Sequence, residues 1–258
     1  MFGFGKKRSK TVTYWVIDQA KYWEQGQMIL DQAHVLIAGT TGSGKSTLIH
    51  KLMWTALSRT PARTQFILAD LKAGLELGRY ARLPHTIRFA RTAEDALSAL
   101  DYAIEIMDSR CEQMYKSGEV LWNGSDVYVV IDELGFLLQQ CGSEALDKLA
   151  RISRLGRAAR IHLLLATQSP NRGKMGIPAV LQQNMTCCIG LKCKTAIESR
   201  QIIGLAGCES LPRYGTAYVT IGPDLYLLPI TPESDDVYRE RIAYWMSDKC
   251  KYQVPKGA

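Results

Sequence analysis

The chain has 258 residues and a formal net charge of +7 at pH 7, with 47% hydrophobic and 22% charged residues. These values are those of an ordinary globular protein with one large domain or two small ones, and the positive charge favours a polyanionic partner without requiring one. No apolar run approaches the roughly 18 residues of a membrane-spanning helix, and the seven cysteines form no C-x-x-C pair, so neither a membrane span, a zinc site nor a disulfide framework is indicated.

The first 30 residues are predicted to form a basic leader followed by a small β element. Residues 1–10 contain a basic cluster with no apolar segment after it, which argues against a secretory signal and favours the cytoplasm. Thr11 to Ile17 is rich in β-branched and aromatic residues. Gln27 to Leu30 is a second extended candidate, with Gly26 at a turn between the two.

A phosphate-binding loop follows. The apolar run from Val35 to Ala38 leads into G-x-x-x-x-G-K-[ST] and then into a helical pattern, which is the strand, loop and helix order that this motif requires. Glycines let backbone N–H groups surround phosphates, Lys45 supplies a charge for the β and γ phosphates, and the Ser46 hydroxyl can ligate Mg²⁺. We therefore expect ATP and Mg²⁺ to bind here. The predicted nucleotide-binding residues are Gly39, Thr40, Thr41, Gly42, Ser43, Gly44, Lys45, Ser46 and Thr47.

From residue 34 onward, strand and helix patterns alternate. The strand candidates are His34 to Ala38, Gln65 to Asp70, Val127 to Ile131, Ile161 to Ala166, Thr186 to Leu191, Thr216 to Ile221 and Leu225 to Pro229. The helix candidates are Lys45 to Ser58, Ala93 to Lys116, Glu144 to Leu155, Ile177 to Gln183, Ala196 to Gly204 and Ser234 to Asp248. The alternation predicts an α/β fold of the RecA-like P-loop type, with a mostly parallel sheet flanked by helices and the ligand at the carboxyl ends of its strands. We expect one ATPase domain over residues 31–230, then a C-terminal helix and tail over 231–258.

Two carboxylates end the strand from Val127 to Ile131. In a P-loop enzyme the first acid, Asp132, holds Mg²⁺ through water, and the next, Glu133, orients and deprotonates the attacking water. The alternative is that Asp132 caps the helix that follows.

Residues 148–174 contain seven basic residues and no acidic one. Since a spacing of three winds around a helix, the first five of these side chains cannot share one face, although a solvated surface remains the alternative for Arg151 and Arg154. Arg157 follows Gly156, so we expect it in a loop or helix end from which it could reach a phosphate bound by a neighbouring subunit. Gln168 ends the next strand, where its amide could sense the γ-phosphate.

These stretches together resemble the motor domain of the FtsK/SpoIIIE family of DNA translocases, within the wider group of HerA-like and conjugative coupling ATPases. The matching segments are 34–46, Asp70-Leu71-Lys72 with Glu76-Leu77 and Pro84-His85, 130–133, 151–159, 161–163, 166–168, and 198–200 with Gly207 and Glu209. The resemblance implies a ring, commonly a hexamer, that threads double-stranded DNA through its centre by hydrolysing ATP. It also implies that Arg157 is an arginine finger inserted into the adjacent site and that Gln168 is the sensor. Pore-facing loops would grip the DNA backbone, with Arg172 and Lys174 as candidates.

The sequence also departs from the large chromosome motors of that family. Asp-Pro-Lys is replaced by Asp70-Leu71-Lys72, and Ser169 stands where the family has an arginine after Ala-Thr-Gln. A membrane-spanning N-terminal part, a long linker and a C-terminal winged-helix module are not expected, which favours a compact motor from a phage, plasmid or integrative element. A separate membrane-bound partner could recruit such a ring. The roles of Asp70, Lys72 and Glu76 stay open at this point.

Two other functions are compatible with these patterns. An FtsK-like ATPase of a secretion or conjugation machine would act on a protein partner instead of moving DNA, and the basic segment argues modestly against it. A structural ATPase that does not hydrolyse ATP is disfavoured by the intact Lys45, Asp132 and Glu133.

Overall fold

The computed structural model describes residues 5–8, 13–16, 22–168 and 177–247. The described residues form a ten-stranded sheet in the order β1-β2-β10-β9-β8-β3-β7-β6-β4-β5. The strands are β1 (Gly5–Arg8), β2 (Thr13–Val16), β3 (His34–Ala38), β4 (Thr64–Ala69), β5 (Thr86–Ala90), β6 (Asp126–Ile131), β7 (Ile161–Thr167), β8 (Cys187–Gly190), β9 (Thr216–Ile221) and β10 (Asp224–Pro229). The helices are α1 (Tyr22–Leu30), α2 (Lys45–Arg59), α3 (Ala93–Ser117), α4 (Leu134–Leu155), α5 (Ala179–Gln182), α6 (Ala196–Ile203) and α7 (Asp235–Met246).

The centre of the sheet is parallel, as the alternating strand and helix patterns predict. All neighbouring strands from β8 to β5 pair in parallel, and β3 lies between β7 and β8. The antiparallel hairpin of β9 and β10 joins at the edge of β8. Because the strands of a parallel pair run in the same direction, the segments that follow β3, β6 and β7 meet at one edge of the sheet.

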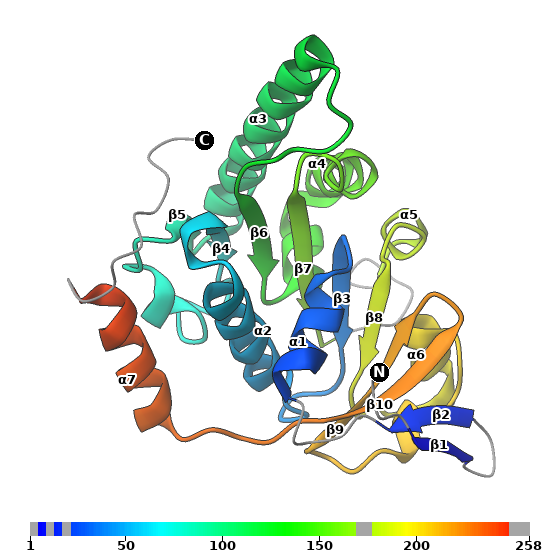
Figure 1. Ribbon diagram of the computed structural model, residues 1–258. Coiled ribbons are helices and arrows are strands. Elements are labelled where there is room, and N and C mark those ends of the chain that lie inside the picture. Colours follow the sequence, from blue (N-terminus) through cyan, green and yellow to red (C-terminus); the bar gives the residue numbers. More distant parts are fainter. Residues whose placement is uncertain (1–4, 9–12, 17–21, 169–176, 248–258) are drawn as a thin grey trace.

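Helices cover both faces of this sheet (Figure 1). Along β3, Val35 and Ile37 point into the apolar layer that α1, α2 and α7 share, whereas Leu36 and Ala38 point into the layer formed with α3 and α4. Burial on both faces explains why this strand is apolar at consecutive positions and does not alternate with polar residues.

The extended segment predicted over Gln27 to Leu30 is wrong, because these residues form the last part of α1. Ile29 and Leu30 are buried against α2, which stabilises the helix by packing. Gly26 is not in a turn but at the crossing of the two helices. A Cβ atom there would lie 2.5 Å from Oγ1 of Thr55, so only glycine allows this close approach.

Three further elements differ from the sequence-based expectation. Residues 1–10 were expected to be a flexible basic leader, but Gly5–Arg8 forms β1, which pairs with β2. The strand β5 was not predicted, and it lies at the edge of the sheet, where most of its side chains are partly exposed and its pattern is weak. The helix α4 begins at Leu134, ten residues before the predicted start, and is interrupted by Gly142 at φ 55°. Among the described residues, no helix is both long and apolar enough to cross a membrane.

Candidate nucleotide site

The phosphate-binding loop connects β3 to α2, as the motif predicts. Gly42 and Gly44 adopt positive φ angles of 75° and 104°, which side chains with a Cβ rarely tolerate. The loop is fixed at its base because Gly39 N donates to Thr167 O at 3.3 Å and Thr40 N donates to Lys192 O at 2.8 Å. The ends of β7 and β8 therefore hold the loop from both sides.

The Lys45 side chain folds back onto its own loop. Its Nζ donates to Gly39 O at 2.7 Å and to Thr40 O at 2.8 Å. Burial lowers the pKa of this ammonium group to about 8, an effect that the nearby Glu133 carboxylate partly opposes. A bound polyphosphate would add to the negative charge that the buried ammonium now receives from carbonyl dipoles, Glu133 and Glu76.

Asp132 and Glu133 follow β6 and are both buried, with different hydrogen bonds. Oδ1 of Asp132 accepts from Leu71 N at 2.9 Å, and Oε1 of Glu133 accepts from Thr167 Oγ1 at 3.1 Å and from Gln168 N at 3.0 Å. Burial raises the pKa of Asp132 to about 6, although the Leu71 N–H and the Lys72 ammonium oppose the shift. A buried carboxylate whose negative charge is stabilised, among the described residues, by only one backbone N–H and one ammonium group is suited to bind a cation.

A loop after β4 carries a lysine to these two acids. Nζ of Lys72 lies 3.4 Å from Oδ2 of Asp132 and 3.9 Å from Oε2 of Glu133. Asp70 organises this loop, because its carboxylate accepts from the backbone N–H groups of Lys72, Glu76 and Leu77. The role of Asp70 is thus structural, and it sets Lys72 and Glu76 beside the phosphate-binding loop.

The donor set fits Mg²⁺. Oδ2 of Asp132 is buried and has no hydrogen bond among the described residues, and only the Lys72 ammonium approaches it. Ser46, whose hydroxyl is the predicted second ligand, lines the same pocket as Lys72. Hard oxygen ligands and a nearby polyphosphate are the surroundings in which proteins bind Mg²⁺. The metal would neutralise charge between the β and γ phosphates.

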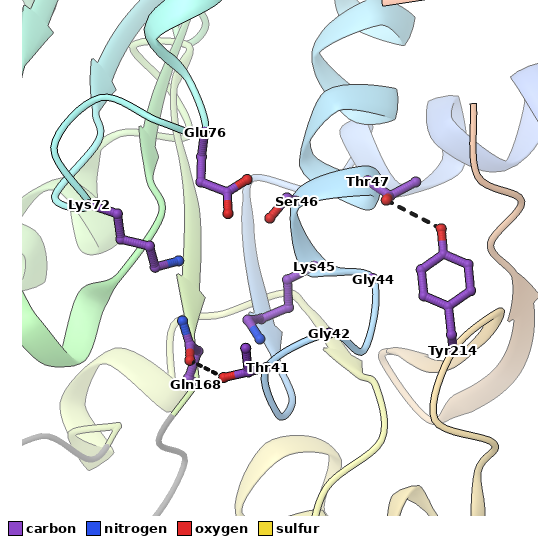
Figure 2. Close-up of a pocket in the computed structure, with 10 residues that line it drawn as sticks. All are labelled: Thr41, Gly42, Gly44, Lys45, Ser46, Thr47, Lys72, Glu76, Gln168 and Tyr214. Carbon is purple, nitrogen blue, oxygen red and sulfur yellow. Dashed lines mark hydrogen bonds between the residues drawn. The ribbon is translucent and has the colours of Figure 1, made fainter. Parts of the chain in front are cut away.

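A pocket of about 230 Å³ lies beside the phosphate-binding loop, and Figure 2 shows the residues that line it, which do not include Asp132 and Glu133. Its lining residues are Thr41, Gly42, Gly44, Lys45, Ser46, Thr47, Lys72, Glu76, Gln168 and Tyr214. Gln168 lies beside the loop as predicted, and its Oε1 accepts from Thr41 Oγ1 at 2.5 Å. Gln168 directly follows β7 and Asp132 directly follows β6, and these two strands are adjacent. Thus the amide and the two carboxylates come together as the strand order requires.

Arg157 does not line this pocket. It is exposed, lies in the turn between α4 and β7, and forms no ion pair with any described residue. β7 runs for seven residues from this turn to the pocket, so Arg157 and Gln168 are separated by about 20 Å of strand. The turn itself is firmly held, since Arg110 Nη1 donates to Ala159 O at 2.8 Å.

Three of the four other described basic residues of the segment 148–174 have partners that lie far away in the sequence. Lys148 pairs with Asp101 and Arg151 with Asp108, so acids of α3 neutralise a run that contains none of its own. Arg160 pairs with Asp126 of β6. The candidate DNA contacts Arg172 and Lys174 lie outside the described residues.

Sequence reasoning left three pocket residues without a role: Lys72, Glu76 and Tyr214. The segment Asp70-Leu71-Lys72 at the end of β4 was a usable signal for the first two, since residues after parallel strands gather at the ligand edge. Tyr214 precedes β9 and offered no such pattern.

Residues 11–121 match the model of the FtsK/SpoIIIE family. The chain carries an FtsK/SpoIIIE family domain. The DNA translocase SftA of Bacillus subtilis is 32% identical over 194 residues, and the DNA translocase FtsK of Helicobacter pylori strain J99 is 31% identical over 195 residues. Each match covers 69% of this chain but only 20% and 22% of those proteins, so the chain spans about a fifth of the length of these relatives.

Solved structures agree with this family assignment at the level of the fold. The pCW3 conjugation coupling protein TcpA, solved with ATPγS, has a TM-score of 0.73 at 21% identity over 84% of this chain and 66% of that one. The cytoplasmic domain of the type VII secretion ATPase EccC of Thermomonospora curvata has a TM-score of 0.67 at 27% identity. This match covers 88% of this chain and 30% of that one. The FtsK/SpoIIIE domain of this chain is thus a P-loop ATPase domain with a mostly parallel sheet.

Replacing Asp132 by asparagine should stabilise the protein in the absence of Mg²⁺ and nucleotide. With its pKa raised from 3.8 to about 6, Asp132 binds a proton more tightly in the folded state than in the unfolded chain. Its stabilising neutral form is therefore complete below about pH 4 and is lost as the pH rises through about 6. At pH 7.5 we expect Asp132→Asn to raise the free energy of unfolding by about 1 to 3 kcal/mol, and at pH 4 to change it little. Urea denaturation with EDTA measures both values, and an equal change at the two pH values would contradict the explanation.

Proposed function

We propose that this chain is the motor domain of an ATP-driven translocase of double-stranded DNA that works as a homo-oligomeric ring, most simply a hexamer. The observation that carries the proposal is the position of Arg157, which among the described residues lies away from the nucleotide site. Lys45, Asp132, Glu133 and Gln168 gather around the phosphate-binding loop, whereas Arg157 lies at the other end of β7 with an exposed guanidinium. A cation that cannot reach its own site is free to enter the site of a neighbour.

In this mechanism Lys45 holds the β and γ phosphates, and Asp132 and Ser46 hold Mg²⁺. Glu133 orients and deprotonates the attacking water, and Gln168 senses the γ-phosphate. Because Glu133 accepts hydrogen bonds from Thr167 and from the Gln168 backbone, a change at the γ-phosphate can pass to the segment that follows β7. That segment contains Arg172 and Lys174, the candidate DNA contacts.

The DNA part of the proposal is supported by the relatives that are DNA translocases, at 32% and 31% identity. The net charge of +7 suits a polyanion. A motor that uses ATP and duplex DNA would work in the cytoplasm, where both are found. A phage, plasmid or integrative element remains the proposed source, and a membrane-bound partner could recruit the ring.

A second candidate function is that of a secretion ATPase that acts on a protein. It is favoured by the 27% identity with the type VII secretion ATPase EccC over 88% of this chain. The two functions differ in whether duplex DNA changes the rate of ATP hydrolysis.

Duplex DNA should stimulate ATP turnover, and the stimulation should fall steeply with salt. Contacts to several phosphates release counterions, so raising salt from 50 to 200 mM should weaken DNA binding by about 10³ to 10⁵ if six to ten phosphates are contacted. Turnover is measured with linear duplex, single strand and no DNA at each salt concentration. Displacement of a triplex-forming strand from the duplex reports movement itself.

The candidate contacts are tested with the double variant Arg172→Ala/Lys174→Ala, which should reduce the stimulation by DNA. The matched control is Lys116→Ala/Arg239→Ala, which removes the same charge from side chains that are 70% and 75% exposed and do not line the phosphate pocket. If duplex DNA fails to stimulate turnover even at low salt, the translocase proposal is wrong and a protein substrate is favoured.

A further inference from the structure

A tyrosine from a distant part of the chain lies against the phosphate-binding loop. Tyr214 precedes β9, and its hydroxyl donates to Thr47 Oγ1 at 3.3 Å. A Cβ atom on Gly44 would lie 3.1 Å from Cε2 of Tyr214, so the edge of the ring packs on the loop where the loop enters α2. The ring is half-buried and also lines the pocket. One part of this side chain therefore supports the loop and another part remains open to a ligand.

Tyr214 lies at the end of the pocket opposite the hydrolytic groups. Figure 2 shows Lys72 and Gln168 on one side of the loop and Tyr214 on the other, with Lys45 and Ser46 between them. A triphosphate is a linear chain whose γ end must face the acids and Gln168. Its other end then leaves the loop beside Thr47, and the nucleoside attached to that end is directed towards Tyr214.

We propose that Tyr214 is the nucleoside-recognition residue of this site and stacks on the base of the bound nucleoside triphosphate. Aromatic rings stack on any base, whereas pairing to a base edge needs polar groups at fixed positions. The contact therefore adds affinity for nucleotides without choosing strongly between adenine and guanine. The inference rests on the proposed ATP-binding function and extends it to the part of the ligand that the phosphate motif does not recognise.

The neighbouring residue, Arg213, is expected to contact a different part of the ligand than Tyr214 does. The guanidinium of Arg213 is exposed, forms no ion pair with a described residue, and lies 3.5 Å from where a Cβ atom of Gly42 would be. A cation beside the loop attracts phosphates whether or not a base is attached to them. Arg213 and Tyr214 should therefore affect different parts of the same ligand.

Calorimetric titration of the full chain with ATPγS and with inorganic tripolyphosphate, each with Mg²⁺, tests the inference. Tyr214→Ala should weaken ATPγS binding by about tenfold or more, the loss typical of one base-stacking contact, and leave tripolyphosphate binding unchanged. Tyr214→Phe should keep ATPγS affinity close to that of the wild type, because it retains the ring. Arg213→Gln should weaken both ligands in the same proportion. Tyr115→Ala, at a tyrosine that is 86% exposed at the end of α3, is the control.

Three results would overturn the inference. Equal losses for both ligands in Tyr214→Ala would mean that the ring only supports the loop. Unchanged ATPγS affinity in that variant would mean that the base does not contact Tyr214. The same conclusion would follow if the wild-type protein bound tripolyphosphate as tightly as ATPγS. Wild-type protein that binds neither ligand would instead refute the nucleotide site itself, so the two failures are distinguishable. Thermal unfolding of each variant verifies that the fold is retained.

Discussion

Replacing Arg157 by alanine should reduce ATP turnover by about 10³ to 10⁵, the range found when an arginine finger is missing, and should leave ATP binding unchanged. The physical reason is the placement of Arg157, in an exposed turn that seven residues of β7 separate from the phosphate pocket. It cannot contribute to nucleotide binding within its own subunit. Turnover is measured with saturating ATP and duplex DNA, and binding by calorimetry with ATPγS.

The control for this variant is Arg154→Ala. Arg154 is exposed near the end of α4, and its Nε donates to Ala150 O of the same helix, so it has the charge of Arg157 without its position. Arg157→Lys keeps the charge but not the planar guanidinium and should recover little turnover. Mixing Arg157→Ala with Glu133→Gln subunits should restore part of the activity, because some interfaces then pair an intact finger with an intact acid. Wild-type turnover in Arg157→Ala would remove the finger assignment.

The parts of the site that lie within one strand and the loop after it could be predicted from the sequence. The phosphate-binding loop, the acids after β6 and Gln168 after β7 each follow an apolar strand, and parallel strands bring such segments to one edge. These segments can be recognised from their local sequence patterns without knowledge of distant contacts. Burial on both faces also made β3, β6 and β7 visible as apolar runs.

The remaining features depend on contacts between distant segments. Tyr214 and Thr47 are 167 residues apart, and no local pattern in either segment indicates the contact. The acidic partner of Arg151 is on α3, so the basic segment looked unpaired in the sequence. The segment Gln27 to Leu30 is short and mostly apolar, which suits a strand or a buried helix equally, and the helix is stabilised by the packing of Ile29 and Leu30 in the core shared with α2.

Glu133→Gln is expected to lower ATP turnover by about 10² to 10⁴ while nucleotide binding and the geometry of the site are kept. An amide oxygen can replace Oε1 as the acceptor for Thr167 Oγ1 and Gln168 N, but an amide cannot take a proton from water. The variant should therefore accumulate in the ATP-bound state. Single-turnover phosphate release measures the chemical step, and ATPγS titration measures binding.

The comparison with Glu133→Ala separates the two roles of this carboxylate. Alanine removes the proton acceptor and also the acceptor for the Gln168 backbone, so the segment after β7 loses its link to the acid. We expect both variants to lose turnover, and only Glu133→Gln to keep ATP-dependent binding of duplex DNA. Glu133→Gln protein that hydrolyses ATP at close to the wild-type rate would show that another group activates the water. Equal DNA binding by both variants would show that the hydrogen bonds to Thr167 and Gln168 do not couple the nucleotide to the DNA contacts.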